Sequence, residues 1–317
     1  MTIQPLIGID VAKHELVVYR QDLEIQQTLE NRPSALKPWL RGLPAQCAIA
    51  VEATGTYHVA LIELAYQCGH EVFVIDGYQL NHYRQGIGGR AKTDSSDARL
   101  LARYLSRERE MLRAWAPPPA AYRSLQSLLR RRATLVQARV AIQQSCAELP
   151  WLAAHLKRLM AQLTRVDQVI QARLRAIVRE AGLRHQVARC QAVEGVGELT
   201  ATALIMAFLR GDFRHSDAFV AFPGLDVRVR DSGKQRGRRK LTKRGDPEVR
   251  RLLHNAAMAA SRLPAWKATY QRYRARGLQA LQVLVILARK LARIAFSLMK
   301  HQTEYTPPSL NRAGGAT

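Results

Sequence analysis

The stretch Leu6-Ile7-Gly8-Ile9-Asp10 begins the first structural element of the chain, a short apolar run that ends in a carboxylate. A second run, Cys47-Ala48-Ile49-Ala50-Val51-Glu52, repeats this pattern. Both have the length and composition of buried strands. A carboxylate at the tip of a buried strand is costly unless a cation or hydrogen-bond donors meet it. We therefore expect Asp10 and Glu52 to share one polar site; the ordinary alternative is two strand ends that face solvent.

Further strand and helix patterns surround these two runs. Apolar spacing predicts strands at residues 6–10, 15–20, 24–29, 48–53 and 71–76, and helices at 33–41, 57–68 and 94–110. Three successive strands followed by strands that alternate with helices indicate a mixed sheet with helices packed on it. This order resembles that of an α/β ribonuclease-H-like domain, the fold of Holliday-junction resolvases.

A run of three prolines, Pro117-Pro118-Pro119, interrupts the pattern, because proline fixes φ and removes a hydrogen-bond donor. We place a domain boundary there, with a catalytic domain at residues 1–113. Apolar spacing then predicts two long helices that form an arm, within a segment of residues 114–186. The exposed arginines of this arm face either nucleic acid or only solvent. A helical C-terminal domain is expected at residues 187–305, followed by a disordered tail at 306–317.

The charge of the chain points to a polyanionic partner. Its 317 residues carry 49 Lys and Arg against 25 Asp and Glu, so the net charge is 49 − 25 = +24. Such an excess says little about the fold and much about partners, and nucleic acid is favoured over a membrane surface. The longest late apolar stretch, residues 280–288, is too short to span a bilayer. The N-terminus shows no secretory signal, and the four cysteines lack C-x-x-C spacing, so we expect a cytoplasmic protein.

Asp94 and Asp97 add two more carboxylates. They are three residues apart, so in a helix they share one face with their Cβ atoms roughly 5–6 Å apart. Without a cation they repel each other, although acids in a first helical turn also interact favourably with the helix dipole. Together with Asp10 and Glu52 they form a set of oxygen ligands suited to a hard divalent metal. Two-metal sites of this kind hold ions roughly 3.5–4 Å apart and clamp the attacking and leaving oxygens of a phosphodiester.

A glycine-containing turn, Val193-Glu194-Gly195-Val196-Gly197, resembles the hairpin of a helix-hairpin-helix element. In such a hairpin the glycines let backbone N–H groups approach a phosphate at the start of the next helix. A tight turn with no ligand has the same sequence pattern.

The densest positive charge lies at residues 228–251, where eleven Lys and Arg face three acids, a net of 11 − 3 = +8. Three glycines in this segment indicate a surface loop that can follow a phosphate backbone. The residues expected to contact phosphates are Arg228, Arg230, Lys234, Arg236, Arg238, Arg239, Lys240, Lys243 and Arg244. Ser232 lies among these cations, which would favour its hydroxyl as a nucleophile toward a phosphodiester. The ordinary alternative is a Ser-Gly turn.

Five motifs together resemble the DEDD-type transposases of the insertion-sequence-110 group, which includes the pilin-gene inverting recombinases. The motifs are GIDVAK at 8–13, VEATGTYH at 51–58, KTDSSDA at 92–98, VEGVG at 193–197 and FPGLDVRVRDSGKQRGRRKLTKRGDPEVRRLLHNAA at 222–257. They span nearly the whole chain in the order of the family.

The resemblance implies a transposase or site-specific recombinase. It implies that Asp10, Glu52, Asp94 and Asp97 bind two magnesium ions, with manganese as the alternative metal. It also implies that Ser232 attacks DNA and forms a transient phosphoserine link. The acids and the serine would come from different subunits of a homo-oligomer. A structured guide RNA encoded by the element would pair with donor and target DNA.

Three other functions remain open at the level of sequence. A metal-dependent junction resolvase would hydrolyse DNA with water, leaving Ser232 as a turn residue. A kinase of the actin-like ATPase fold also begins with a strand like Ile7-Gly8-Ile9-Asp10, but the phosphate-binding glycine expected after Asp10 is absent. A purely architectural nucleic-acid binder would have no use for the four acids.

Overall fold

A computed structural model describes residues 4–53, 55–88, 94–228, 231–232, 235–237 and 239–307. For Asp94, Ser95, Asp231, Ser232, Gln235 and Arg236 it describes the backbone alone. The chain divides into two compact units, Met1–Pro117 and Pro118–Thr317, each described by itself below. The division falls within the proline run.

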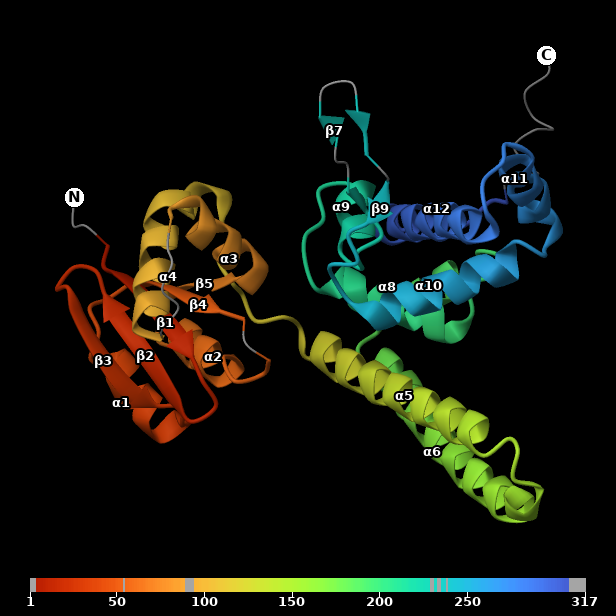
Figure 1. The fold of residues 1–317 in the computed structure, drawn as a ribbon, viewed down its shortest axis with the longest axis horizontal. Helices are drawn as coiled ribbons and strands as arrows, with labels where there is room; N and C mark the ends of the chain where they lie inside the picture. The colour runs from red at the N-terminus through yellow and green to blue at the C-terminus, as the bar shows by residue number, and fades with distance from the viewer. Residues whose placement is uncertain are drawn as a thin grey trace. The chain divides into compact units, whose positions relative to one another are not determined.

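The first unit is a five-stranded mixed sheet with helices on both faces (Figure 1). Its strands are β1 (Leu6–Val11), β2 (Glu15–Arg20), β3 (Ile25–Glu30), β4 (Ala48–Glu52) and β5 (Glu71–Ile75), in the order β3-β2-β1-β4-β5. The first three strands are antiparallel neighbours, whereas β4 pairs parallel with both β1 and β5. The predicted α/β fold class and all five predicted strands are therefore confirmed.

The two faces of the sheet are covered by different helices. Side chains of α1 (Pro33–Arg41) and α2 (Val59–Gln67) pack with Ile9 and Val51 on one face. Side chains of α3 (Gly77–Gly86) and α4 (Asp94–Glu108) pack with Ala50 and Ile75 on the other. A short 3-10 helix, η1 (Arg109–Met111), follows α4.

Helix α3 is the element of this unit that the sequence did not predict. Leu80 is its one buried residue, so the segment has no apolar periodicity to read. The helix begins because the Asp76 carboxylate caps it, accepting hydrogen bonds from the backbone N–H groups of Tyr78 and Gln79 at 3.0 and 3.2 Å.

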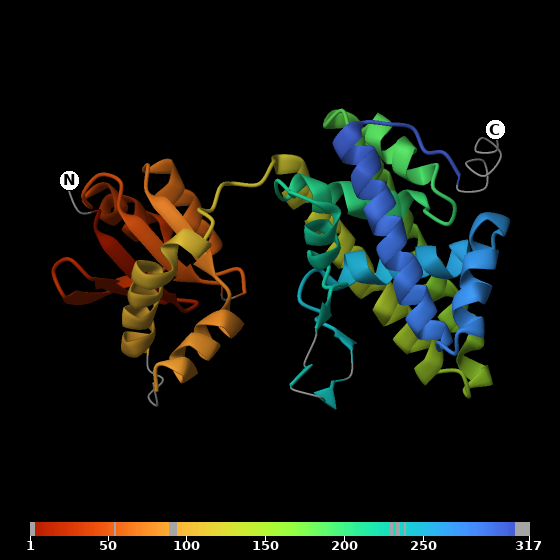
Figure 2. The same ribbon diagram turned by 90° about the horizontal axis from the view of Figure 1, so that it is seen from above.

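The second unit is mostly helical. The predicted arm is present as α5 (Ala120–Ser145) and α6 (Ala153–Glu180), joined through the 3-10 helix η2 (Pro150–Leu152). The other helices are α7 (Arg184–Gln191), α8 (Glu198–Leu209), α9 (Ser216–Ala221), α10 (Pro247–Ala260), α11 (Pro264–Ala275) and α12 (Ala280–His301). Helix α8 is buried on all sides over residues 200–207 and forms the centre of the core. Helix α12 crosses α10, as Figure 2 shows.

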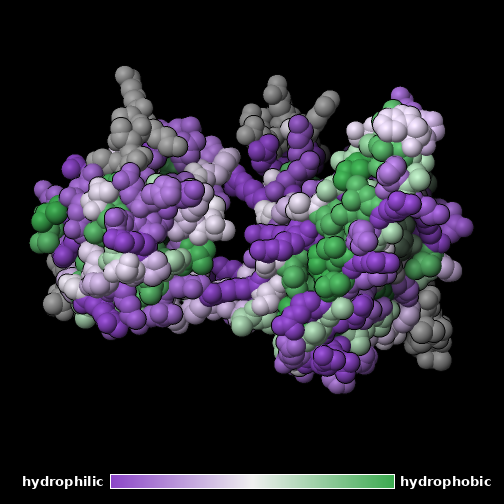
Figure 3. All heavy atoms as spheres, turned by 90° about the horizontal axis from the view of Figure 1, so that it is seen from below, coloured by the Kyte–Doolittle hydropathy of each residue, from purple (hydrophilic) through white to green (hydrophobic). Residues whose placement is uncertain are grey.

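The surface of the second unit carries apolar side chains along the arm, seen as a green stripe in Figure 3. The most exposed of them are Trp151, at 74%, and Val169, at 68%. None of the helices in the described ranges combines the length and the apolar content that a membrane span requires.

Candidate active site

Gly8 fixes the distance between α4 and the sheet. A Cβ atom at this position would lie 2.6 Å from the backbone nitrogen of Ala102 and would also collide with the carbonyl oxygen of Ala98. Helix α4 therefore lies directly on the backbone of β1. Since alternate residues of a strand point to the same face, Asp10 projects to the α4 face together with Gly8.

Glu52 reaches the same face from the neighbouring strand. Strands β1 and β4 are parallel, with Gly8 beside Ala50 and Ile9 beside Val51. Ala50 packs in the apolar cluster under α4, so Glu52, two residues later, points the same way. The two carboxylates thus leave the ends of adjacent parallel strands on one face of the sheet.

Helix α4 brings its first turn to this end of the sheet. Arg109, just beyond its last residue, donates hydrogen bonds to Glu71 at the start of β5 and to Gln4 just before β1. The end of the helix thus lies at the start of these strands, and its beginning lies near their carboxyl ends. Asp97 therefore lies at the same end as Asp10 and Glu52; Asp94 begins the helix, and its side chain is outside the described part of the structure.

Asp97 is bound by an arginine that the sequence did not single out. The Asp97 side chain is 5% exposed, and its Oδ1 accepts a hydrogen bond from Arg84 Nη2 at 2.6 Å and one from Ser96 Oγ at 3.2 Å. Arg84 belongs to α3, the helix without an apolar pattern, so no signal in the sequence marked it.

The other two carboxylates have different surroundings. Asp10 Oδ1 accepts a hydrogen bond from the backbone N–H of Val11 at 3.1 Å. The Glu52 carboxylate lies against Gly77, where a Cβ atom would clash with it. Gly77 thus leaves room for Glu52 at the start of α3.

The donor set fits a hard divalent cation, because it consists of carboxylate oxygens. Among the side chains that the structure describes, no three His, Cys, Asp or Glu residues form a ready metal cage. Asp10, Glu52 and Asp97 thus lie at the same end of the sheet without forming a closed metal cage, and Arg84 is hydrogen-bonded to one oxygen of Asp97.

Ser232 lies in a small β-hairpin of the second unit. Strand β7 (Asp231–Ser232) pairs with β8 (Gln235–Arg236), and β6 (Val227–Arg228) pairs with β9 (Lys240–Leu241). Ser232 is the last residue of β7. Figures 1 and 2 show the hairpin projecting from the helices of its unit.

Five of the predicted phosphate-binding cations are exposed around this hairpin: Arg228, Arg239, Lys240, Lys243 and Arg244. Arg230, Lys234 and Arg238 lie outside the described residues, and only the backbone of Arg236 is described. The structure thus displays a basic surface around the strand that carries Ser232.

The basic segment is shorter than the sequence suggested. Residues 247–251 form the first turns of α10, which Asp246 caps, rather than a loop. Arg251 forms an ion pair with Glu248 at 2.6 Å, and Arg250 donates to the carbonyl oxygen of Pro223 at 2.5 Å. These two cations are used within the unit.

Gly245 fixes the base of the hairpin instead of making it flexible. Its φ is +134°, and a Cβ atom there would collide with the carbonyl oxygen of Phe222. The backbone at the base of the hairpin is therefore closely packed.

Gly195 has a structural role within the fold. Its φ is +87°, and a Cβ atom would lie 2.6 Å from both the carbonyl oxygen of Ala256 and the backbone nitrogen of Ala260. The turn thus packs directly on α10, which accounts for this glycine without a ligand. Gly197 precedes the first turn of α8 and would meet nothing within 4 Å if it carried a Cβ atom, so phosphate contact at this turn stays a prediction.

Glu194 ties this turn to the C-terminal part of the unit. Its Oε2 accepts hydrogen bonds from Trp266 Nε1 at 3.2 Å and from the Tyr305 hydroxyl at 2.6 Å. Burial is the main cause that raises the pKa of Tyr305, and the hydrogen bond with Glu194 is the second.

Comparison with known proteins gives two matching family models. The first, described as "Transposase", matches residues 7–149, and the second, described as "Transposase IS116/IS110/IS902 family", matches residues 187–272. The chain is 30% identical to the protein named "Probable family 20 transposase" of Pseudomonas aeruginosa, over 95% of this chain and 98% of the relative. The chain belongs to the IS110 family of transposases.

Two further relatives are named for gene inversion. The "Pilin gene-inverting protein" of Moraxella bovis is 26% identical, and that of Moraxella lacunata is 24% identical, each over 81% of this chain and 81% of the relative. The IS110-family chain is accordingly a DNA transposase or recombinase. Its DEDD-type family model indicates use of a divalent metal. Family membership decides against the kinase alternative.

Proposed function

We propose that this chain cleaves and rejoins DNA at a composite site, in which Asp10, Glu52, Asp94 and Asp97 bind magnesium and Ser232 is the nucleophile. The observation that carries the proposal is the gathering of carboxylates from β1, β4 and α4 at one end of the sheet, on one face. The sheet order β3-β2-β1-β4-β5 also supports a ribonuclease-H-like fold for the first unit.

The acidic residues would act as metal ligands and orienting groups. The proposed metal is magnesium, bound as two ions, and manganese is the alternative. These ions would polarise the phosphodiester and stabilise charge on the attacking and leaving oxygens. Asp10 and Glu52 would bind from the strand ends, and Asp94 and Asp97 from the first turn of α4. Oδ1 of Asp97 accepts hydrogen bonds from Arg84 and Ser96, so a metal bound through this oxygen would compete with these two donors.

Ser232 would form and break the covalent link to DNA. Its Oγ attacks the phosphorus, the bond from phosphorus to the leaving deoxyribose oxygen breaks, and that oxygen takes up a proton. A hydroxyl of the partner strand then attacks the phosphoserine, so that Ser232 leaves with its proton restored and the new DNA strand is joined. The exposed cations around the hairpin, such as Arg228 and Lys240, would stabilise the developing negative charge.

The partners that follow are donor and target DNA, a structured guide RNA and further copies of the same chain. The net charge of +24 supports a nucleic-acid partner in general. The guide RNA rests on the family resemblance, and it would explain how so basic a protein selects its DNA sites without an obvious base-reading helix.

The test uses the full chain with DNA that carries both sites and with RNA transcribed from the flanks of the gene. Ser232→Ala should abolish the covalent protein–DNA adduct on a denaturing gel. Asp10→Ala should abolish cleavage while nucleic-acid binding stays close to that of the wild type. Ser124→Ala, at an exposed serine on α5, is the matched control and should recombine normally.

Two results would overturn parts of the proposal. Full recombination by Ser232→Ala or by Asp10→Ala would sink the mechanism. Normal cleavage by Ser232→Ala, with no adduct from the wild type either, would favour the hydrolytic junction resolvase.

A further inference from the structure

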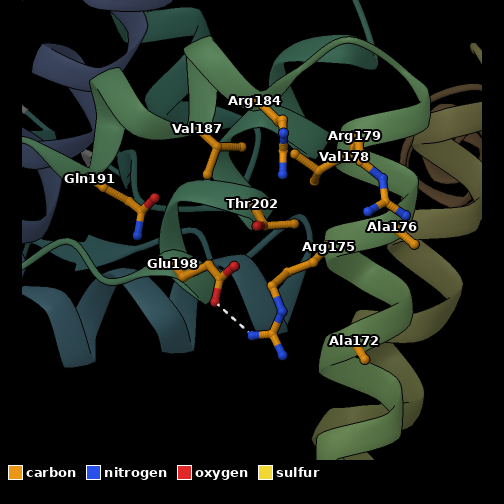
Figure 4. Close-up of a pocket in the computed structure, with 10 residues that line it drawn as sticks. All are labelled: Ala172, Arg175, Ala176, Val178, Arg179, Arg184, Val187, Gln191, Glu198 and Thr202. Atoms are coloured by element: carbon orange, nitrogen blue, oxygen red, sulfur yellow. Dashed lines mark hydrogen bonds and ion pairs between the residues drawn. The ribbon is translucent and has the colours of Figure 1, made fainter.

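A concave pocket of about 460 Å³ opens between the arm and the adjoining helices of the second unit (Figure 4). Helix α6 contributes Arg175 and Arg179, and Arg184 begins α7. The apolar part of the lining includes Val178 and Val187, each 6% exposed. The pocket thus has a mixed polar and apolar lining that includes three arginines.

The charges in this pocket are not balanced. Arg175 Nη1 lies 3.0 Å from Glu198 Oε2, which neutralises one arginine. Neither Arg179 nor Arg184 has an ion-pair or hydrogen-bond partner within the residues that the structure describes. Three arginines and one glutamate give 3 − 1 = +2 in one concavity. All three arginines are exposed, so an anion can reach them from solvent.

Thr202 adds a hydroxyl group to the pocket. It lies on α8 and is 3% exposed, and Figure 4 shows its side chain in the pocket among the arginines. Its hydroxyl oxygen is not one of the buried atoms left without a hydrogen-bond partner among the described residues. A hydroxyl can both donate and accept a hydrogen bond, so it can contribute one to an anion in the pocket.

The chemistry of the lining selects the class of ligand. Guanidinium groups bind phosphate through two parallel hydrogen bonds, and their planes also stack on unpaired bases. The volume is in the range of small-molecule sites, and Ala172 and Ala176 offer an apolar surface that a lone phosphate would not use.

We propose that this pocket binds one nucleotide of a single-stranded nucleic-acid segment. Its phosphate would lie on Arg179, Arg184 and the Thr202 hydroxyl, with its nucleoside against the two alanines of α6, while Glu198 keeps Arg175 in place. The inference rests on the proposed function for its nucleic-acid partner, and it assigns a contact distant in sequence from both Ser232 and the acidic residues.

The test measures binding of labelled single-stranded DNA and RNA of one sequence to the full chain, by fluorescence anisotropy at one fixed salt concentration. The double variant Arg179→Gln/Arg184→Gln should weaken binding of one or both strands by about tenfold or more. Thr202→Val, which keeps the shape and removes the hydroxyl, should weaken it several-fold. The strand that loses more affinity identifies whether DNA or RNA occupies the pocket.

The matched control is Arg158→Gln/Arg165→Gln, which removes the same charge from exposed positions of α6, the helix that carries Arg179. It should lose much less affinity than the pocket variant. Equal losses in the two double variants, or wild-type affinity in the pocket variant, would overturn the pocket assignment and leave the proposed function intact. Failure of the wild type to bind either strand would instead count against the proposed function. Unchanged thermal unfolding confirms that each variant is folded.

Discussion

At the scale of single residues, the Arg84–Asp97 ion pair links the fold of the first unit to the proposed metal site. Both side chains are nearly buried, at 11% and 5% exposure, so neither charge is well hydrated. Removing one partner of a buried pair typically destabilises a protein by roughly 3–5 kcal/mol, because it leaves the other charge uncompensated. A metal ion that binds Asp97 through Oδ1 would compete with this arginine for the same oxygen.

We predict that Arg84→Met lowers the melting temperature in the absence of metal and increases the stabilisation that magnesium or manganese provides. The reason is that an ion then binds Asp97 without displacing a competitor, and tighter binding to the folded state raises stability by mass action. The measurement is thermal unfolding with and without each ion. Arg20→Met, which breaks the ion pair with Asp22 elsewhere in the unit, is the control and should leave the metal response unchanged. An identical metal response in Arg84→Met and in the wild type would refute the competition.

At the scale of elements, the contact between α4 and β1 decides where Asp97 lies. We predict that Gly8→Ala destabilises the first unit by about 1–3 kcal/mol, since the added methyl group meets the backbone of α4 and must displace it. Hydrogen exchange should become faster in peptides covering residues 98–108. The control is Gly86→Ala, whose methyl group would meet nothing within 4 Å and which should be neutral or slightly stabilising. Unchanged exchange in α4 of the Gly8 variant would show that the close contact is not required.

The sequence predicted well those strands and helices that bury several apolar side chains in the core. Strands β1 and β4 were readable because their runs are buried, and Asp10 and Glu52 followed from them as strand ends. Helix α3 was missed because it buries only Leu80, and Arg84 was missed with it.

The basic segment shows a second limit of sequence reasoning. Strands β6 to β9 are two residues long each, too short for any alternation to show, and their pairing is set by tertiary contacts. The start of α10 was readable, because Asp246 and Pro247 form an N-cap followed by a first-turn proline. We nevertheless interpreted residues 247–251 as part of the loop, because the high positive charge of residues 228–251 suggested one continuous basic segment.

At the scale of the whole molecule, the proposed active site is divided between two units. The acids belong to the unit Met1–Pro117 and Ser232 to the unit Pro118–Thr317. The chain between them passes through three prolines, whose fixed φ angles restrict it. A site divided in this way can be completed either within one chain or between two chains, and the two cases differ in how inactive variants combine.

We predict that Asp10→Ala and Ser232→Ala chains, each inactive alone, form covalent DNA adducts when they are co-expressed. If one subunit supplies the acids and another the serine, a mixed pair contains one site in which both parts are intact. For random pairing in a dimer, half of the dimers are mixed and each has one intact site of two, so activity should return to about a quarter of the wild-type level. Co-expressed Asp10→Ala and Asp97→Ala should stay inactive, because every site in that mixture lacks an acid. Differently tagged chains establish by co-purification that mixed oligomers form. Absence of adducts despite mixed oligomers would mean that the acids and the serine of one chain act together.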